Sequence, residues 1–370
     1  MLDATGGRKT FRTTLHDGLG RPVQIVTDAL GESGRYTTTR MAYEGLETIC
    51  REWLPVECGN DCRIMDEQEI ETLADETYCD RMAYTTNHTD VLGRKEISIG
   101  PGQVWYASDK KVEKEYLVNK EREVKRYYAP DDGSYSLEQK GYYEPSTLRV
   151  TKTTDEDGRV SLVYTDMQER KILERRTDGT LDLDTYYIYD DKGNLRFVLS
   201  PEYQKSGYKA IFGYEYRYDN RGNILKKFLP QSSYVQYWYD SADRLKYMQD
   251  ARMREKGLYR FFLYDNLSRP VVQGLCRTCK RDKSPVTATF NAQDSGFQGT
   301  GYTLSSETGI EDVELETINY YDRYTFMENR QIMLPDLLRQ YCDTMAIGLT
   351  SQYEGHSKGM ATATLVRTEA

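Results

Sequence analysis

The chain has 370 residues, of which 38% are hydrophobic and 29% are charged, and its net charge is −9 at pH 7. An acidic chain without clustered lysine and arginine is a poor ligand for phosphates, so we expect no nucleic-acid partner. The chain also lacks a run of about 18 apolar residues, so we expect no membrane-spanning helix and no membrane insertion.

Tyrosine is the most unusual feature of the composition. The chain contains 32 Tyr but only 9 Phe. Tyr has a high β-propensity, and its hydroxyl needs water or a hydrogen-bond partner. The composition therefore predicts a mainly β protein whose sheets have half-hydrated faces.

The N-terminal part, residues 1–180, contains several divergent patterns of a turn followed by a strand. The clearest are residues 16–26, 90–102 and 155–164, the last with an Asp-Gly hairpin signal. Residues 66–78 are acidic and interrupt the β pattern, either as a short helix or as an excursion from the sheet. We therefore expect an N-terminal β region with one interruption.

Four well-formed repeats occupy residues 181–280. Each has aromatic residues, then Tyr-Asp, a turn and a second strand, and the Tyr-Asp pairs recur every ~20–30 residues. The Asp opens the turn, and the fourth turn position needs a left-handed residue, supplied by Gly193, Gly222, Asp243 and Ser268. Each unit is therefore predicted to be a β-hairpin with a bulge. The signature residues are Tyr189, Asp190, Gly193, Tyr218, Asp219, Gly222, Tyr239, Asp240, Tyr264 and Asp265.

The C-terminal part, residues 281–370, is a degenerate repeat region. Residues 280–316 are rich in Ser, Thr, Gly and Asp, which predicts a long loop or weak strands. Tyr320, Tyr321 and Asp322 close the repeat series. Residues 331–346 carry apolar side chains at helical spacing and are predicted to form a short amphipathic helix.

The Tyr-Asp-x-x-Gly-Asn-Leu units resemble the YD repeats of bacterial Rhs-repeat proteins. Residues 17–24, 92–105 and 318–322 resemble further segments of that family, so the likeness extends over residues 11–365. It implies stacked antiparallel β-hairpins in a curved, spiral open sheet that forms part of a shell, with a few short helices. The family's C-terminal core has a self-cleavage motif that this sequence lacks, so we expect the chain to be part of a longer protein.

The resemblance also implies a function. Rhs-repeat proteins of the polymorphic-toxin type are secreted or lie at the cell surface, and their shells enclose or present a C-terminal passenger domain. We therefore expect a structural shell or scaffold segment whose partners are its own passenger or adjoining Rhs repeats.

Enzymatic chemistry is not expected. The chain has only three histidines, none beside a Ser or Cys nucleophile motif, and it has no phosphate-binding loop. Turn chemistry explains the paired carboxylates. We assign no catalytic residue, no cofactor and no metal site.

Two closely spaced cysteine pairs leave several interpretations open. Cys58 and Cys62 form one pair, and Cys276 and Cys279 form the other. Each pair could close a disulfide, the two together could bind zinc, or the thiols could be incidental.

Carbohydrate binding is the alternative function. Exposed aromatic rings can stack on sugar rings, so an open sheet face could act as an adhesive module for cell-surface glycans. The residues that would do so are Tyr214, Tyr216, Tyr237 and Trp238.

Overall fold

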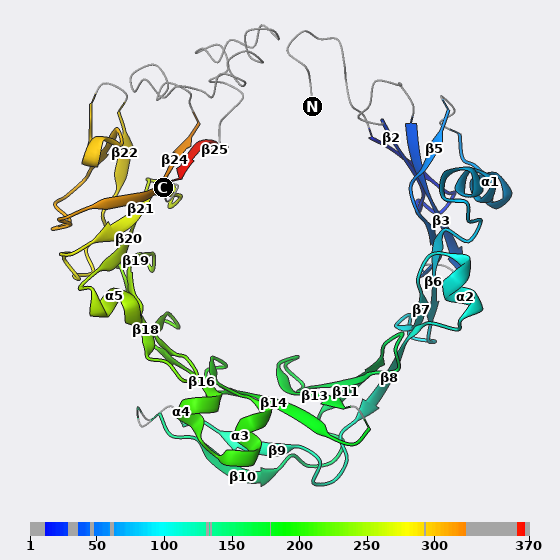
Figure 1. Cartoon of the computed structure of the whole chain (residues 1–370), viewed down its shortest axis with the longest axis horizontal. Helices are drawn as coiled ribbons and strands as arrows, with labels where there is room; N and C mark the ends of the chain where they lie inside the picture. The colour runs from blue at the N-terminus through cyan, green and yellow to red at the C-terminus, as the bar shows by residue number, and fades with distance from the viewer. Residues whose placement is uncertain are drawn as a thin grey trace, which may run out of the picture. The chain divides into compact units, whose positions relative to one another are not determined.

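The computed structural model describes residues 12–28, 36–44, 48–59, 63–130, 133, 135–177, 179–291, 294–322 and 361–366. Within these residues the chain is mainly β, with antiparallel pairing between neighbouring strands and a few short helices, as the sequence predicted (Figure 1). The predicted helix at 331–346 lies outside the described residues. The division of the sequence into three regions stays a prediction.

The chain forms two compact units. Unit 1 comprises Met1–Tyr127 and Gln139–Tyr186, and unit 2 comprises Tyr128–Glu138 and Tyr187–Ala370. The short segment at 128–138 thus belongs with the second unit, although it comes early in the sequence. We describe each unit separately.

Unit 1 begins with strands that pair mainly with their sequence neighbours. Its first elements are β1 (Arg12–His16), β2 (Pro22–Asp28), β3 (Tyr36–Glu44), β4 (Thr48–Trp53), β5 (Val56–Cys58), α1 (Glu67–Tyr78), β6 (Tyr84–Thr89), β7 (Lys95–Ile99), α2 (Gln103–Ala107) and β8 (Val112–Val118). Strand β3 pairs with β2, β4 and β5, and β4 pairs with β6. A small core that includes Val26, Trp53 and Ile70 lies between these strands and α1.

Helix α1 confirms the helical interpretation of residues 66–78. Asp66 caps it: the Asp66 carboxylate accepts a hydrogen bond from the Glu69 backbone N–H at 2.8 Å, and the Glu69 carboxylate accepts one from the Asp66 backbone N–H at 3.0 Å. This reciprocal capping box satisfies two amides that a helix start leaves without partners.

Apart from one separate two-stranded sheet, the rest of unit 1 is a meander of adjacent strands. The remaining elements up to the second unit are β9 (Lys125–Tyr128), β10 (Glu138–Tyr142), β11 (Arg149–Thr154), β12 (Val160–Thr165), β13 (Lys171–Thr177) and β14 (Asp182–Tyr189). Strand β11 pairs with β8 and with β12, and β13 pairs with β12 and with β14. The Asp-Gly signal at 157–158 lies in the β11–β12 turn, as predicted.

Unit 2 continues with hairpins and short helices. Its elements are β15 (Leu195–Leu199), α3 (Pro201–Ser206), α4 (Lys209–Phe212), β16 (Gly213–Tyr218), β17 (Ile224–Phe228), β18 (Tyr234–Tyr239), β19 (Leu245–Gln249), α5 (Ala251–Glu255), β20 (Tyr259–Tyr264), β21 (Pro270–Cys276), β22 (Ala288–Phe290), η1 (Phe297–Gly299), β23 (Tyr302–Leu304), β24 (Glu314–Tyr321) and β25 (Ala361–Val366). Strands β15 to β21 pair in sequence order, and β24 joins β21 to β25.

Residues 277–313 form an insertion between β21 and β24. The prediction of a loop or weak strands fits this segment, whose regular elements are the three-residue strands β22 and β23 and the helix η1. Val286, Ala288, Tyr302 and Ile310 of the insertion are buried in one core with Tyr247, Phe261 and Val272 of the sheet. The insertion therefore covers one face of strands β19 to β21.

Candidate functional site

Eight turns between paired strands share one local structure. In each, an Asp is followed at the fourth turn position by a residue with positive φ and at the fifth by Arg or Asn. The eight opening residues are Asp17, Asp90, Asp155, Asp166, Asp190, Asp219, Asp240 and Asp265. The repeats thus converge on one turn chemistry, which we call the Asp turn.

The Asp166 turn shows how the structure forms. One carboxylate oxygen of Asp166 accepts hydrogen bonds from the backbone N–H groups of Gln168 at 2.9 Å and Arg170 at 3.0 Å. The other accepts one from Arg170 Nε at 2.8 Å. Between them, Glu169 has a φ of 62°, the left-handed value that the turn requires. A single carboxylate therefore holds both the backbone and the next side chain.

The predicted left-handed positions are confirmed. Gly193 and Gly222 have φ values of 85° and 87°, and Asp243 and Ser268 have values of 59° and 61°. A register shift precedes six of the eight turns, as expected for a turn followed by a bulge.

A tyrosine of the next strand closes several of these turns. The Tyr hydroxyl donates to the backbone carbonyl of the residue five positions after the turn Asp. The five donor and acceptor pairs are Tyr43 to Pro22 (2.7 Å), Tyr116 to Lys95 (2.9 Å), Tyr218 to Leu195 (2.7 Å), Tyr264 to Leu245 (3.0 Å) and Tyr321 to Pro270 (3.1 Å). The hydroxyls that the composition predicted to need a partner thus bind the neighbouring hairpin.

The arginine of the turn lies over the ring of the same tyrosine in four of these five cases. Its guanidinium carbon lies 3.9–5.3 Å from the ring centroid in the pairs Arg21–Tyr43, Arg94–Tyr116, Arg244–Tyr264 and Arg269–Tyr321. Such cation–π contacts add to the attraction between adjacent hairpins. We call the combination of Asp turn, arginine and tyrosine the turn clamp.

Charge and hydrogen bonding shift the acidity of the turn carboxylates. The backbone N–H of Arg21 lowers the pKa of Asp17, and the Arg21 side chain adds to this effect. Burial alone would raise the pKa of Asp90, Asp166 and Asp219, but hydrogen bonds from turn amides and from the fifth turn residue outweigh it, and the pKa of each is lowered. The hydrogen bonds of the Asp turns therefore hold these carboxylates in the ionised form.

Adjacent turns also bind one another in unit 2. Arg221 donates from one Nη to the Ser241 carbonyl and to the Asp243 carboxylate, both at 3.0 Å, and Asn223 donates to the same carboxylate at 2.9 Å. Farther along, Arg269 donates to both oxygens of Asp322 at 3.1 and 2.7 Å. The turns are therefore cross-linked along the edge of the sheet.

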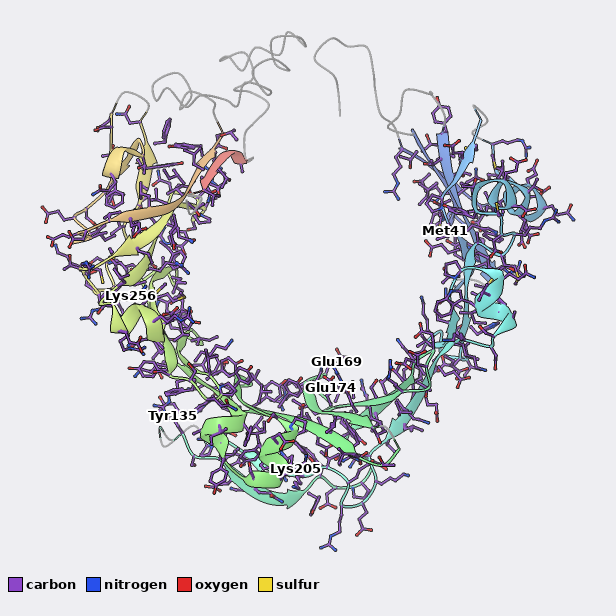
Figure 2. All side chains as sticks on the ribbon, in the orientation of Figure 1. Met41, Tyr135, Glu169, Glu174, Lys205 and Lys256 are labelled. Carbon is purple, nitrogen blue, oxygen red and sulfur yellow. The ribbon has the colours of Figure 1, made fainter. Side chains whose placement is uncertain are left out.

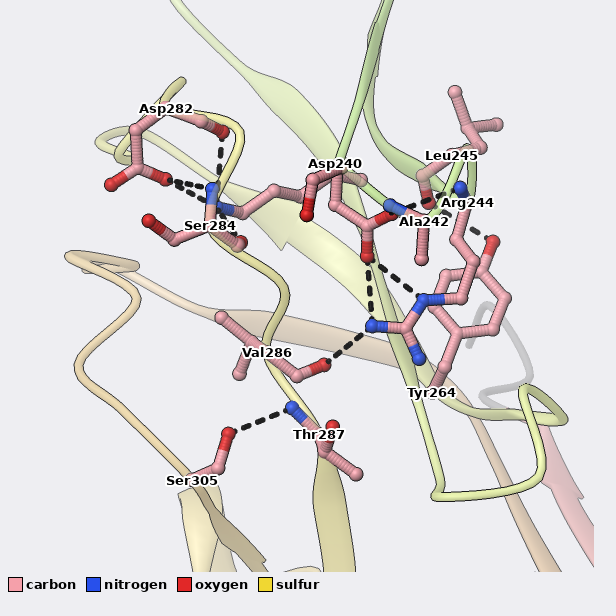
Figure 3. A network of polar contacts seen from close by, with 12 residues as sticks. Asp240, Ala242, Arg244, Leu245, Tyr264, Asp282, Ser284, Val286, Thr287 and Ser305 are labelled. Carbon is pink, nitrogen blue, oxygen red and sulfur yellow. Dashed lines mark hydrogen bonds and ion pairs between the residues drawn. The ribbon is translucent and has the colours of Figure 1, made fainter.

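The insertion meets the Asp240 turn, as Figure 3 shows. Arg244 bonds Asp240 at 2.8 Å and also donates to the Val286 carbonyl of the insertion at 3.4 Å. The neighbouring Lys246, a buried residue of β19, donates to the Asp282 carboxylate at 2.7 Å and the Ser284 carbonyl at 3.1 Å. A buried ammonium needs such partners, and the insertion supplies them.

The structure separates the proposed glycan-stacking residues. Tyr214 and Tyr216 alternate along β16, and Tyr237 lies close enough to Tyr216 to raise its pKa slightly, after burial and Tyr214. Trp238 points to the opposite face, where it packs against the core under the insertion and contacts Tyr259 with ring centroids 5.8 Å apart. Only the three tyrosines therefore share a face.

The two cysteine pairs also differ. Cys58 is buried beside β3, but Cys62 lies outside the described residues. Cys276 and Cys279 are both described, as free thiols near the end of β21 that pack against the same core. Within the described residues, no three His, Cys, Asp or Glu side chains gather in a way that could hold a metal ion.

A hollow of about 430 Å³ in unit 2 is lined by both charged and apolar side chains. It is lined in part by Asp265, Arg269, Phe290, Tyr302 and Asp322. Its arginine already binds both of these carboxylates in a turn clamp and a cross-link. The charged groups there serve the structure of the sheet edge.

In the described part of the chain, no helix combines the length and the hydropathy needed to cross a membrane.

Sequence reasoning missed the Asp166 turn and one of the clamp tyrosines. The Asp166 turn has Glu169, which is labelled in Figure 2, in its left-handed position, so the Gly signal of the repeat is absent. Tyr116 is followed by Leu117 instead of Asp, yet its hydroxyl makes the same bond as Tyr264. The spacing from Asp to Arg four residues later, which Asp166 shares with the predicted turn at Asp90, is the signal that would have identified the Asp166 hairpin.

Comparisons with known proteins give distant likenesses. No family model and no curated protein matches the chain. Among solved structures, a chain of the crystal structure of TcdB2-TccC3-TEV has a TM-score of 0.47 at 13% identity, over 96% of this chain and 14% of that one. A chain of the crystal structure of TcdB2-TccC3 has a TM-score of 0.47 at 15% identity, over 86% of this chain and 14% of that one.

A chain of the Photorhabdus luminescens Tc holotoxin pore, with a mutation in TccC3, has a TM-score of 0.48 at 14% identity. The match covers 86% of this chain and 13% of that one. The chain therefore spans only a small part of the chains it matches. At this identity and TM-score the likeness assigns neither a family nor an activity to it.

Proposed function

We propose that the chain is a non-enzymatic structural segment: a length of β wall in an Rhs-type repeat protein that encloses or presents a passenger domain. One observation carries the proposal. Five tyrosine hydroxyls, including those of the signature residues Tyr218 and Tyr264, bind a carbonyl of the neighbouring hairpin, and the carboxylates of the Asp turns hold their own turns. The carboxylates and tyrosine hydroxyls of the repeats, which a catalytic site would need to be accessible, are instead bonded to other groups of the protein.

The pattern of the contacts supports a wall. Each turn clamp joins a hairpin to the following strand, and the cross-links from Arg221 and Arg269 join turns at the sheet edge. When each hairpin contacts mainly the hairpins beside it, the sheet grows by one hairpin with each repeat of the sequence, as in other repeat proteins. Together with the sequence resemblance to YD repeats, this favours scaffolding, and secretion or surface display in the longer protein.

Limited proteolysis tests the enclosure. The longer protein that we expect to contain this chain is digested with a protease, and cleavage of its C-terminal passenger is followed over time. We expect slower cleavage than for the isolated passenger, and a turn-clamp variant such as Asp240→Ala should restore fast cleavage. Equal cleavage rates for the enclosed and the isolated passenger would sink the proposal.

Glycan binding is the second candidate, favoured by the shared face of Tyr214, Tyr216 and Tyr237. Lys227 Nζ lies 5.8 Å and 5.7 Å from the ring centroids of Tyr214 and Tyr216, so a cation also lies at this face. A glycan array with the chain and with its Tyr214→Ala and Tyr237→Ala variants tests it. Binding that the variants lose supports an adhesive role, whereas the absence of binding by the unaltered chain rules against it.

A further inference from the structure

Cys276 and Cys279 lie at the junction between the sheet and the insertion. Cys276 is the last residue of β21 and is fully buried, and Cys279 is partly buried against the same core. Between them, Arg277 N–H donates to the Glu311 carbonyl at 3.1 Å, which ties this bend to the other end of the insertion. The two thiols therefore sit in an ordered bend of the chain.

The surroundings of the pair are polar on one side. The Tyr247 hydroxyl is buried, has no hydrogen-bond partner among the described residues, and lies close enough to both thiols for them to raise its pKa, although burial has the larger effect. Lys246 and Arg281 lie near Cys279. Asp282 binds Lys246 and is the acidic group facing this cluster. Two cations and an unused hydroxyl donor thus surround a buried sulfur pair.

From this geometry we propose that Cys276 and Cys279 are a dithiol–disulfide redox couple, with Cys279 as the attacking sulfur and Cys276 as the resolving sulfur. The site takes a low-molecular-weight disulfide, such as oxidised glutathione, as its oxidant.

The roles of the two sulfurs follow from access and charge. Cys279 is the more exposed of the two, so an external disulfide reaches it first. The neighbouring Cys276 thiol lowers the pKa of the Cys279 thiol against the effect of burial, and Arg281 and Lys246 lower it further. The Cys279 thiol and burial raise the pKa of Cys276. The thiolate is the nucleophile in thiol–disulfide exchange, so Cys279 attacks.

The exchange balances in two steps. The Cys279 thiolate attacks one sulfur of oxidised glutathione, forms a mixed disulfide and releases one glutathione thiolate. Cys276 then loses its proton and attacks the Cys279 sulfur, which forms the internal disulfide and releases the second glutathione thiolate. Two protein thiols are oxidised and one glutathione disulfide is reduced to two glutathione molecules.

A disulfide between Cys276 and Cys279 would restrict the motion of the chain where the insertion 277–313 begins. The loop closed by the bond is short, so the gain in global stability from loop closure is small. The local effect is larger, because the bond joins the end of β21 to the bend that carries the Arg277–Glu311 contact. We expect slower proteolysis within 277–313 in the oxidised chain.

The test equilibrates the full 370-residue chain in glutathione buffers of increasing oxidised fraction, blocks free thiols with a maleimide, and maps disulfides by peptide mass spectrometry. We expect one internal bond between Cys276 and Cys279 that reforms reversibly, while Cys79, exposed at the end of α1, stays a thiol or a mixed disulfide. Cys79→Ser is the matched control and should leave the internal bond unchanged.

Two variants separate the roles. Cys276→Ser should accumulate glutathione on Cys279 because no resolving thiol is present, and Cys279→Ser should leave Cys276 unmodified because it is buried. The proposal is overturned if the unaltered chain forms no bond between Cys276 and Cys279, or if glutathione accumulates on Cys279 to the same extent with and without Cys276. Mapping of the unaltered chain decides the question even where a variant fails to fold.

Discussion

Tyr264 donates its hydroxyl hydrogen to the backbone carbonyl of Leu245, 3.0 Å away, and so joins one hairpin to the hairpin before it. The guanidinium of Arg244 lies 5.3 Å from the centroid of the same ring, and its Nε bonds Asp240. The signature Tyr of one repeat thus contacts the arginine that binds the signature Asp of the previous repeat. Residues of the repeat motif therefore make the contact between adjacent hairpins.

The Tyr264 bond can be tested by removing a single oxygen. Tyr264→Phe keeps the ring and the cation–π contact but leaves the Leu245 carbonyl without its donor, so we expect a loss of about 0.5–1.5 kcal/mol in the free energy of unfolding. Tyr259→Phe is the matched control, because Tyr259 lies on the same strand and its hydroxyl makes no hydrogen bond among the described residues. Urea unfolding midpoints measure both, and equal losses would contradict the role of the hydroxyl bond.

The Asp166 turn separates hydrogen bonding from charge. Asp166→Ala removes three hydrogen bonds from the turn and should cost about 1–3 kcal/mol, whereas Asp166→Asn keeps an acceptor oxygen for the backbone amides and should cost less. Thermal unfolding of the two variants measures the order. Equal costs for the two variants, both of which lose the negative charge, would show that the Arg170 ion pair, and not the amide bonds, holds the turn.

Stability should fall in acid because of the turn carboxylates. The pKa of Asp17, Asp90, Asp166 and Asp219 lies below the ordinary value of 3.8 in the folded chain. The unfolded chain therefore binds protons first, and the stabilisation present above about pH 4 is lost as the pH falls through the folded pKa values. Urea midpoints between about pH 6 and pH 2.5 measure this slope. Asp166→Asn should make it shallower, and an unchanged slope would count against the assignment.

At the left-handed fourth position of the turn, removing a glycine and introducing one should have opposite effects on stability. Gly222 has a φ of 87°, and a Cβ there would meet only Asn194 Oδ1 at 3.7 Å, so Gly222→Ala should cost about 1–2 kcal/mol through backbone strain alone. Glu169 has a φ of 62°, so Glu169→Gly relieves strain and should raise stability by up to about 1 kcal/mol. Chemical denaturation checks both signs, and a destabilising Glu169→Gly would contradict the argument.

The two hydrogen bonds from Arg269 to the Asp322 carboxylate form the last cross-link of unit 2 described above, and they can be tested by substitution. Arg269→Lys keeps the charge but loses the paired bonds to Asp322, so we expect faster hydrogen exchange in β24 and a cost of about 1.5–3 kcal/mol. Arg176→Lys, at an exposed ion pair with Glu174, is the control and should change little. An unchanged rate of hydrogen exchange in β24 of Arg269→Lys would show that the Arg269–Asp322 bonds do not hold this strand.

The sequence by itself determined the hairpins and their turns. An Asp at the turn start, a left-handed residue at its fourth position and alternating aromatic strands are local signals, and Gly193, Gly222, Asp243 and Ser268 all took the predicted conformation. The capping box of α1 is equally local. The short helices α3 and α5 were not assigned individually, although Pro201 stands at the first position of α3 and Asp250 caps α5.

The tertiary structure alone decided which groups meet across repeats. Tyr264 and Leu245 are separated by 19 residues, and Lys246 and Asp282 by 36, so no local periodicity links them. The covering insertion determined that Trp238 is packed in a core while Tyr237 beside it is not. It also brought Tyr247 to the Cys276–Cys279 pair. Side-chain alternation assigns faces, but the packing of distant segments decides which face is covered and which hydroxyls and charges find partners.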